Sequence, residues 1–247
     1  MTTLGIDIGG SGIKGALVDT SSGTLVSDRI RFSTPENPKP KLVAKIIIDI
    51  VKKLSYKGII GAGFPGVVRH GITYTAANIH KDWIGCDANS LVSKVTGYPT
   101  FFLNDADAAG LAEMRFGIGK ENKKGSVLFI TVGTGIGSAL FIDGILVPNL
   151  ELGHLEIKGQ EAEHRASDAT RQIEKLSWKE WGRKFSRVLN TYEKLFNPDL
   201  FILGGGISSR YEKYAHYLDV KTKIMPAKLE NLAGIIGAAM AAEEQNK

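Results

Sequence analysis

Cysteine is almost absent from this chain of 247 residues, which contains only Cys86. A single cysteine cannot form an internal disulfide or a cysteine-rich zinc site, so the sequence is typical of a reducing compartment. Long apolar runs are also missing. No stretch free of both charged and polar residues exceeds 11 residues; residues 58–68 form such a stretch and include a proline, whereas a membrane-spanning helix needs about 20. With no signal-peptide pattern before it, the sequence predicts a cytoplasmic protein without a membrane segment.

Charge of one sign is not in marked excess either. The chain has 31 Lys and Arg against 26 Asp and Glu, a net charge of +5, which does not predict nucleic-acid binding but is compatible with an anionic ligand. Its 43% hydrophobic and 23% charged residues exclude disorder and a coiled coil. Glycine, in contrast, is abundant, with 29 residues, where average usage of about 7% predicts about 17. The positions of these glycines therefore need an explanation.

One local pattern, two strands joined by a glycine turn, occurs twice. Residues 4–8 and 13–19 flank the first turn, and residues 127–132 and 138–143 flank the second, 123 residues later. Each copy predicts a β-hairpin. Because the whole pattern is repeated, the sequence predicts two lobes of related design.

Helical and strand-like segments alternate in the rest of the chain, which is typical of an α/β fold with parallel strands. Further helices are expected to close the chain. The expected helices are residues 41–54, 88–96 and 177–196, and the expected strands are residues 58–64, 100–103 and 200–203.

The two hairpin turns have the composition of phosphate-binding turns, because glycines leave backbone N–H groups open to an anion. Asp7 lies at the mouth of the first turn. A carboxylate beside phosphate is repulsive unless a divalent cation bridges them, so Asp7 predicts Mg²⁺, held through water. The alternative is a purely structural glycine hairpin. The predicted phosphate-binding residues are Gly9, Gly10, Ser11, Gly12 and Lys14 in the first turn, and Thr131, Gly133, Thr134 and Gly135 in the second.

A third glycine cluster, Gly204, Gly205 and Gly206, follows the expected strand at residues 200–203 and precedes an expected helix. A helix N-terminus beside close-approach backbone can bind an anion. A plain turn between strand and helix is the alternative.

Asn104 and Asp105 directly follow the strand expected at residues 100–103. In an open parallel sheet this is the edge where ligands bind. A carboxylate there can accept the proton of an attacking sugar hydroxyl, so Asp105 is the candidate catalytic base and Asn104 a candidate sugar contact. The alternatives are a helix cap at this position, and Asp107 as a rival carboxylate.

Glu151 and His154 lie either side of a glycine bend and could bind adjacent sugar hydroxyls. A zinc site formed by His154 with Glu161, Glu163 and His164 is the competing interpretation, although the spacing fits no common zinc motif. The polar segment after residue 64 favours ligand contacts by Gly66 and Asn78, with an ordinary surface loop as the alternative.

This set of motifs resembles the ROK sugar kinases over nearly the whole chain. The motifs that carry the resemblance are residues 7–14, 64–66, 104–105, 131–137, 151–154 and 203–208. Longer runs are similar to the members of that family that use polyphosphate. These runs are residues 64–71, 75–85, 103–117, 131–141, 151–156 and 197–208.

The resemblance implies an actin-like ATPase (ribonuclease H-like) duplicated α/β fold, with two lobes around a central cleft. It implies a small lobe of residues 1–105, completed by a helix at about 232–247, and a large lobe of residues 106–231. It makes Asp105 the base, assigns both turns to phosphates and the 204–206 cluster to the far end of the donor. The residues assigned to glucose are Gly66, Asn78, Asn104, Asp105, Glu151, His154 and Glu163.

The implied reaction is Mg²⁺-dependent transfer of a phosphoryl group from polyphosphate, with ATP as a second donor, to the 6-hydroxyl of glucose. Residues 157–163 stand where many members carry a cysteine-rich zinc motif, so no zinc is expected, and only three residues precede Leu4, so no DNA-binding module is expected. A homodimer is implied. The basic residues that could lead a polyphosphate chain out of the site are Lys14, Arg69, Lys81, Arg115, Lys120, Lys123 and Lys124.

Two other functions remain open at this point. One is an ATP-only hexose or N-acylhexosamine kinase of the same family. The other is a non-enzymatic actin-like sugar sensor or filament-forming protein, which the intact Asn104-Asp105 pair and both phosphate turns disfavour.

Overall fold

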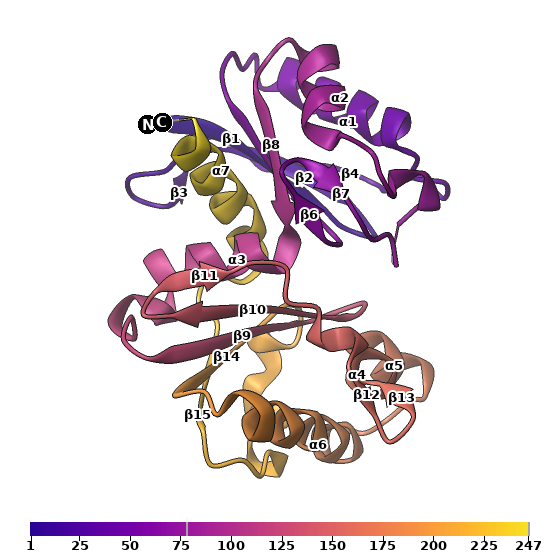
Figure 1. Ribbon diagram of the computed structural model, residues 1–247, viewed down its shortest axis with the longest axis vertical. Coiled ribbons are helices and arrows are strands. Elements are labelled where there is room, and N and C mark those ends of the chain that lie inside the picture. Colours follow the sequence, from indigo (N-terminus) through magenta and orange to yellow (C-terminus); the bar gives the residue numbers. More distant parts are fainter. Residues whose placement is uncertain (78, 247) are drawn as a thin grey trace. The chain divides into compact units, whose positions relative to one another are not determined.

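The computed structural model describes residues 1–77 and 79–246, and these form two units, each with its own sheet and core (Figure 1). Unit 1 consists of residues 1–112 together with the segment from Leu232 onward, and unit 2 is residues 113–231. The chain therefore passes between the units twice, after Ala112 and after Asn231. Unit 1 is discontinuous in sequence, whereas unit 2 is continuous.

The sheet of unit 1 begins with the first predicted hairpin. Strands β1 and β2 pair antiparallel along their full length, and β5 and β8 follow parallel to β1, giving the order β3-β2-β1-β5-β8, with β4 also paired to β2. The carboxyl ends of β1, β5 and β8 therefore share one edge. The strands of unit 1 are β1 (Thr2–Ile8), β2 (Ile13–Asp19), β3 (Thr24–Leu25), β4 (Ile30–Phe32), β5 (Ile60–Phe64), β6 (Val68–Arg69), β7 (Ile72–Thr73) and β8 (Thr100–Asn104).

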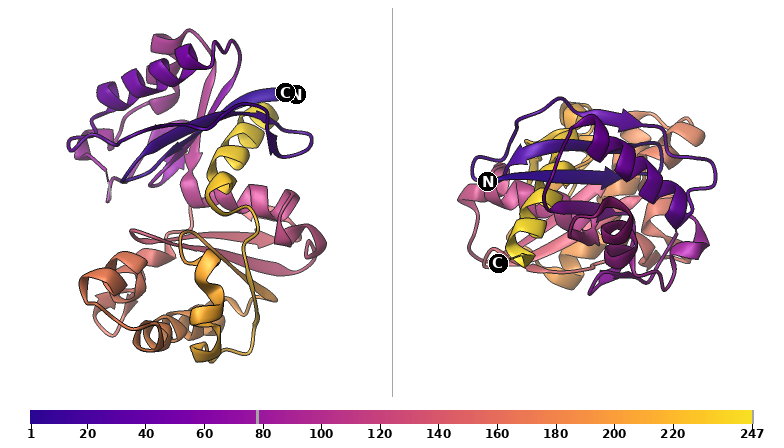
Figure 2. Two further views of the ribbon diagram at one scale, coloured as in Figure 1. Left: turned by 180° about the vertical axis from the view of Figure 1, so that it is seen from behind. Right: turned by 90° about the horizontal axis from the view of Figure 1, so that it is seen from above.

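Helices cover both faces of this sheet. Figure 2 shows α7 along one face, with α1 and α2 on the opposite face. Helix α3 starts directly after β8 and extends across the boundary at residue 112. The helices are α1 (Pro40–Lys53), the short η1 (Lys81–Trp83), α2 (Ala88–Thr96), α3 (Asp105–Arg115) and α7 (Ala233–Gln245), and the short η6 (Glu230–Leu232) lies across the boundary before α7.

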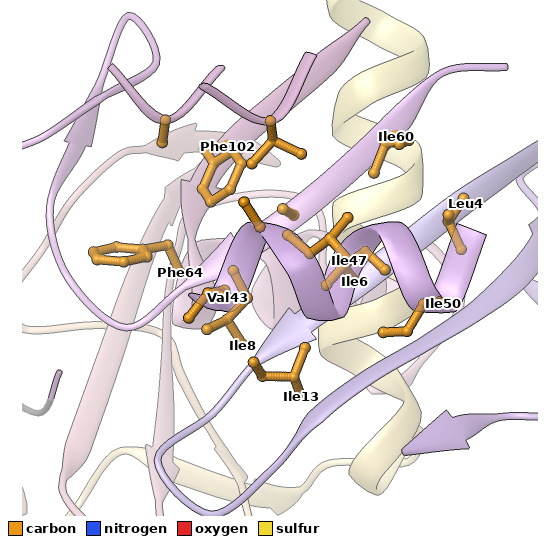
Figure 3. Close-up of a cluster of buried hydrophobic side chains, with 14 of the residues drawn as sticks. Leu4, Ile6, Ile8, Ile13, Val43, Ile47, Ile50, Ile60, Phe64 and Phe102 are labelled. Carbon is orange, nitrogen blue, oxygen red and sulfur yellow. The ribbon is translucent and has the colours of Figure 1, made fainter. Parts of the chain in front are cut away.

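The core between α1 and the sheet is aliphatic and aromatic (Figure 3). Val43, Ile47 and Ile50 recur every three or four residues along α1, so they share one face of the helix, and all three are fully buried. They pack on the side chains of β1 that alternate toward this face. The labelled members of this core are Leu4, Ile6, Ile8, Ile13, Val43, Ile47, Ile50, Ile60, Phe64 and Phe102.

Helix α7 packs on the other face at backbone distance. A Cβ atom on Gly5 of β1 would lie 2.0 Å from the Ile235 carbonyl oxygen, and one on Gly61 of β5 would lie 1.8 Å from the Ala238 carbonyl oxygen. These are distances that no side chain tolerates. Glycine at these two strand positions therefore lets the helix lie directly against the sheet.

Unit 2 is built around the second predicted hairpin. Its sheet has the order β11-β10-β9-β14-β15, with β9 and β10 antiparallel and β14 parallel to β9. The strands are β9 (Ser126–Val132), β10 (Ile136–Ile142), β11 (Ile145–Val147), β14 (Leu200–Gly204) and β15 (Lys223–Pro226), and the separate pair β12 (Glu156–Ile157) and β13 (Gln160–Glu161).

The longest helix of unit 2 is α6, which begins with a capping box formed by Ser177 and Glu180 and ends at Asn197 in the left-handed conformation. Among the described residues, no helix combines the length and apolar character that crossing a membrane requires. The helical segments of unit 2 are η2 (Ile118–Glu121), η3 (Leu152–His154), α4 (Ala162–Ala166), α5 (Asp168–Ile173), α6 (Trp178–Phe196), η4 (Ser208–Lys213) and η5 (Ala215–Tyr217).

The helices and strands expected from the sequence are confirmed with end shifts of at most two residues. Helix α2 has the expected bounds, and β8 is one residue longer than expected because it includes Asn104. Helix α3 was not expected. It is buried along most of its length, so its sequence lacks the periodicity of an amphipathic helix.

The helix expected directly after Gly206 is wrong in type. The chain forms the short 3₁₀ segment η4, which is kinked at Arg210. Both the backbone N–H and the hydroxyl of Ser208 donate to the Gly205 carbonyl oxygen, which sets a three-residue spacing. The dipole that a longer α-helix would have directed at the glycine cluster is therefore missing here.

Candidate active site

The first hairpin turn, residues 9–12 between β1 and β2, is closed by one backbone hydrogen bond, from Gly9 N to Gly12 O at 3.0 Å. The Thr34 hydroxyl donates to Gly9 O at 2.6 Å and holds the turn from outside. A Cβ on Gly10 would meet nothing within 4 Å, so open space lies beside its backbone. Ser11 at the tip is exposed. The turn thus presents accessible backbone, as phosphate binding requires.

A cavity of about 390 Å³ adjoins this turn within unit 1. Gly9 and Gly10 form one wall, and Pro65, from the loop after β5, forms part of another. Glu36 and His80 contribute charged or titratable side chains to a space whose lining is more polar than apolar. The remaining lining residues are Thr34, Pro35, Pro38, Ala77 and Ile79.

Asp7 and Lys14 lie opposite each other in the β1–β2 ladder. The Lys14 ammonium donates to Oδ2 of Asp7 at 2.9 Å, and both side chains are mostly buried. A Cβ atom on Gly234, in the first turn of α7, would lie 3.5 Å from Oδ1 of Asp7. Among the described residues, no group donates a hydrogen bond to this Oδ1 atom. One carboxylate oxygen is therefore left for a water-held Mg²⁺, so the donor chemistry fits that ion.

Asn104 is the last residue of β8 and is 4% exposed. Its Oδ1 accepts from Asp107 N at 3.0 Å, which caps α3, and its Nδ2 donates to Gly66 O at 3.2 Å. The capping alternative is thus confirmed for Asn104. The same amide also fixes the loop after β5 against the end of β8.

Asp105 is the first residue of α3 and is partly exposed, with Oδ1 accepting from Ala106 N at 2.8 Å. Asp107, the rival carboxylate, is 2% exposed. Of the two carboxylates, Asp105 is the more accessible to a substrate. Its position at the carboxyl edge of the parallel strands agrees with the expected geometry.

Gly66 is buried and its conformation is restricted by packing. A Cβ at this position would lie 2.9 Å from both the carbonyl and the hydroxyl oxygen of Thr75. Gly66 O accepts the Asn104 hydrogen bond, so Gly66 positions the Asn104 side chain. The predicted contact Asn78 lies outside the described residues.

The second hairpin turn, in unit 2, is also closed by one backbone hydrogen bond, with Gly133 N donating to Gly135 O at 3.0 Å. Gly133 has open space at its Cβ position, and Thr134 is exposed. Gly133 O accepts from Ala169 N of α5 at 3.1 Å. Thr131 is half-buried at the end of β9. Both turns are thus closed by a backbone hydrogen bond between glycines, and the first turn is one residue longer than the second.

Glu151 and His154 lie at the ends of η3, which packs directly on the strand after this turn. A Cβ on Gly153 would lie 2.1 Å from Ile136 O, so η3 needs glycine here. Glu163 of α4 is 8% exposed and accepts from Ile136 N at 3.3 Å. The structure thus brings Glu151, His154 and Glu163 together beside β10.

The His154 ring lies among carboxylates. Its Nε2 is 3.6 Å from Glu151, and its Nδ1 is 3.3 Å from Glu161 and 4.0 Å from Glu163. Burial raises the pKa of the Glu151 carboxyl, and the nearby Glu163 carboxylate raises it further, whereas the His154 ring acts to lower it. Ligand atoms of His154, Glu161 and Glu163 all lie within 4.8 Å of one another, so the cluster that could bind sugar hydroxyls also has the residue types of the metal alternative. Glu161 was not predicted as a sugar-site residue.

The glycine cluster after β14 serves mainly packing in the structure. Gly205 has φ +78°, and a Cβ there would lie 2.5 Å from Val132 O. Gly204 lies against the Phe129 ring, and a Cβ atom on Gly204 would lie 2.8 Å from Cζ of that ring. Only Gly206 has open space beside it.

Arg31 of β4 is a cation at the first turn that was not among the residues predicted from the sequence. Its guanidinium donates to Ser11 O at 3.0 Å and lies over Gly12. Since β4 has only three residues and pairs with β2 at a distance in sequence, no local pattern pointed to it. Of the basic residues that were predicted, Lys14 is paired with Asp7. The others are exposed, namely Arg69, Lys81, Arg115, Lys120, Lys123 and Lys124.

Known proteins similar to this chain match it over nearly its whole length. The polyphosphate glucokinase of Mycobacterium tuberculosis is 48% identical over 238 residues, which are 96% of this chain and 89% of that protein. The crystal structure of an inorganic polyphosphate/ATP-glucomannokinase from Arthrobacter sp. strain KM matches with a TM-score of 0.95 at 47% identity and covers 99% of both chains.

A ROK family glucokinase from Streptomyces griseus, solved with glucose and AMPPNP, matches with a TM-score of 0.83 at 24% identity, covering 99% of this chain and 100% of that one. At this identity the likeness concerns the fold, which is the duplicated α/β fold of the actin-like ATPases. The ROK family profile itself matches residues 3–166, more than half of the sequence. The chain therefore belongs to the ROK family.

Proposed function

We propose that this protein transfers the terminal phosphoryl group of inorganic polyphosphate to the 6-hydroxyl of glucose, giving glucose 6-phosphate. The observation that carries the proposal is the 48% identity, over 96% of the chain, to a polyphosphate glucokinase. The ATP named for the Arthrobacter structure supports ATP as a second donor, and its glucomannokinase activity makes mannose an acceptor to test.

Asp105 is the proposed catalytic base. As the 6-hydroxyl oxygen attacks the terminal phosphorus, the bond from that phosphorus to the bridging oxygen breaks and the Asp105 carboxylate accepts the hydroxyl proton. Asn104, which caps α3 and contacts Gly66, keeps the start of this helix in place. Glu151, His154 and Glu163 are proposed to bind the remaining sugar hydroxyls.

The two hairpin turns are proposed to hold the phosphates of the donor through backbone N–H groups and the hydroxyls of Ser11 and Thr134. Asp7, with one carboxylate oxygen not used by Lys14, is proposed to hold Mg²⁺ through water. When bound, Mg²⁺ would supply positive charge to the phosphate oxygens. No zinc is proposed, and elemental analysis of the purified protein would test this.

Replacing Asp105 by Asn tests the proposed base. The variant should keep the fold, since Asn preserves the shape, and should lose a factor of about 10²–10⁴ in kcat. The measurement is glucose 6-phosphate formation with polyphosphate and with ATP, alongside thermal unfolding. Asp28→Asn, on an exposed loop, is the matched control and should keep wild-type turnover. An Asp105→Asn variant that retained more than a tenth of wild-type kcat would contradict the assignment.

The same assay separates this function from its rivals. Product formed with ATP alone would indicate an ATP-dependent hexose kinase, and no product with any donor would indicate a sugar sensor. A homodimer in the cytoplasm is part of the proposal, and light scattering on the purified protein tests the dimer.

A further inference from the structure

Three charged residues form a row across neighbouring strands beside the first hairpin turn. Asp7 of β1 lies opposite Lys14 of β2, and Lys14 lies opposite Arg31 of β4. Residues directly opposite in antiparallel ladders point to the same face of the sheet. The row therefore presents a carboxylate, an ammonium and a guanidinium on one face, with neighbouring Ile6, Ile8 and Ile13 buried in the core.

Within this row the charges of Asp7 and Lys14 balance. Their 2.9 Å ion pair is mostly shielded from solvent, so Lys14 contributes little net positive charge to a ligand. Arg31 differs, because its side chain is exposed and no carboxylate of the described residues lies within ion-pair distance of it. The net positive charge of the row thus belongs to Arg31.

Arg31 is also held in place at the turn. One guanidinium N–H donates to Ser11 O at 3.0 Å. A Cβ atom on Gly12 would lie 2.7 Å from Nε of Arg31. Gly12 therefore leaves the space in which the guanidinium lies. Arginine has five N–H donors, and one is used by Ser11, so several remain for a ligand at the turn.

We propose that Arg31 binds the terminal phosphate groups of the donor at the first hairpin turn. The proposal rests on the proposed function for the identity of the donor, a linear polyphosphate. A guanidinium matches phosphate oxygens with two parallel hydrogen bonds, and a chain of phosphates needs a cation that no carboxylate neutralises. Arg31 meets this requirement, whereas Lys14 is committed to Asp7.

The test measures binding of tripolyphosphate to the whole protein by calorimetry, without glucose, in parallel with steady-state kinetics. Arg31→Gln removes the charge and should weaken tripolyphosphate binding and raise the donor KM about tenfold or more. Arg31→Lys retains the charge but not the paired donors and should fall between. Lys94→Gln is the matched control for charge. It lies on α2, which packs beside β8 at the far edge of the sheet from β4, and it should bind like wild type.

Salt dependence separates a phosphate contact from a structural role. If Arg31 neutralises a phosphate, the slope of log KM for polyphosphate against log salt should become less steep by about one in Arg31→Gln, while the glucose KM stays unchanged. If Arg31 only supports the turn, the melting temperature and glucose KM will change and the salt slope will not, which would overturn the proposal.

The remaining outcomes also decide between explanations. Tripolyphosphate affinity within twofold of wild type in Arg31→Gln, or no tripolyphosphate binding by the wild type, would overturn the role of Arg31. A wild type that binds tripolyphosphate but forms no glucose 6-phosphate from polyphosphate would instead contradict the proposed function. The binding data on Arg31 would remain valid in that case.

Discussion

At the scale of single residues, several candidate side chains have structural as well as chemical tasks. The sequence places Asn104 and Asp105 at the end of a strand, and that much is predictable because polar residues directly follow an apolar run. The division of tasks between them is not predictable. It depends on Gly66, 38 residues away, whose carbonyl accepts the Asn104 amide. Arg31 was missed for the same reason, because its partner Ser11 is remote in sequence.

Glu151 allows a prediction about stability and pH. Burial is the main reason why its pKa in the folded protein is raised above the ordinary value of 4.5. Between these two pKa values the folded protein binds more protons than the unfolded chain, so this carboxylate makes the protein less stable as pH rises through that window. Glu151→Gln should remove the effect and raise the melting temperature relative to wild type more at pH 7 than at pH 4.

Thermal unfolding of both proteins between pH 4 and pH 7 checks this prediction. Parallel profiles for wild type and Glu151→Gln would contradict it. Glu174→Gln is a suitable control, because Glu174 is exposed and its substitution should not show the Glu151 pattern.

At the scale of elements, the glycine surplus has two physical causes where the sequence indicated one. Gly10 and Gly133 lie in open turns, as phosphate binding requires. Gly5 and Gly61 lie inside strands and allow α7 to pack against the sheet at backbone distance. A glycine in a turn can be predicted from the residues beside it in the sequence. A glycine that allows close packing cannot be predicted in this way, because the helix that packs on it comes from a distant part of the chain.

Gly61→Ala should therefore be strongly destabilising. The added Cβ would lie 1.8 Å from the Ala238 carbonyl oxygen, and backbone on both sides cannot move aside without separating α7 from β5. Overpacking typically costs about 1–3 kcal/mol and occasionally more, and we expect the upper end of that range or beyond. Urea denaturation followed by circular dichroism measures the loss.

Gly206→Ala is the matched control for this substitution, since a Cβ there meets nothing within 4 Å. Its free energy of unfolding should stay within about 0.5 kcal/mol of wild type, as for most substitutions away from packed sites. Equal stabilities of Gly61→Ala and Gly206→Ala would show that α7 does not depend on the close approach.

At the scale of the whole molecule, the repeated hairpin made the duplicated design predictable, because both copies retain the strand, turn and strand order. The α/β class followed from the alternation of periodic segments. The burial of α3, and the position of the unit boundary after Ala112 within this helix, depend on tertiary packing and have no local sequence signal.

Unit 1 should fail to fold without α7. This helix buries Ile235, which lies against Gly5 of β1, and Ile236 completely or nearly so, and each such side chain contributes about 1.5–3 kcal/mol to a domain whose total stability is about 5–15 kcal/mol. A chain ending at Asn231 should expose Trp83, which is fully buried in unit 1, and keep Trp181 buried in unit 2.

Tryptophan emission distinguishes these two environments when it is recorded on variants in which Trp178 is replaced and either Trp83 or Trp181 is the single remaining tryptophan. A chain ending at Gln245, which lacks only exposed or terminal residues beyond α7, is the control and should have the emission of the full chain. Native-like Trp83 emission in the chain ending at Asn231 would contradict the dependence of unit 1 on α7.

The discontinuity of unit 1 also has a consequence for synthesis on the ribosome. The first hairpin, with Asp7 and the candidate phosphate turn, emerges before unit 2, whereas α7, which covers one face of its sheet, emerges only after unit 2. The continuous unit 2 can be completed while the nascent chain still exposes the face of β1 and β5 around Gly5 and Gly61. During that interval unit 1 lacks the helix that covers this face, so the end of β1 that carries Asp7 can reach its final packing against Gly234 only after α7 has emerged.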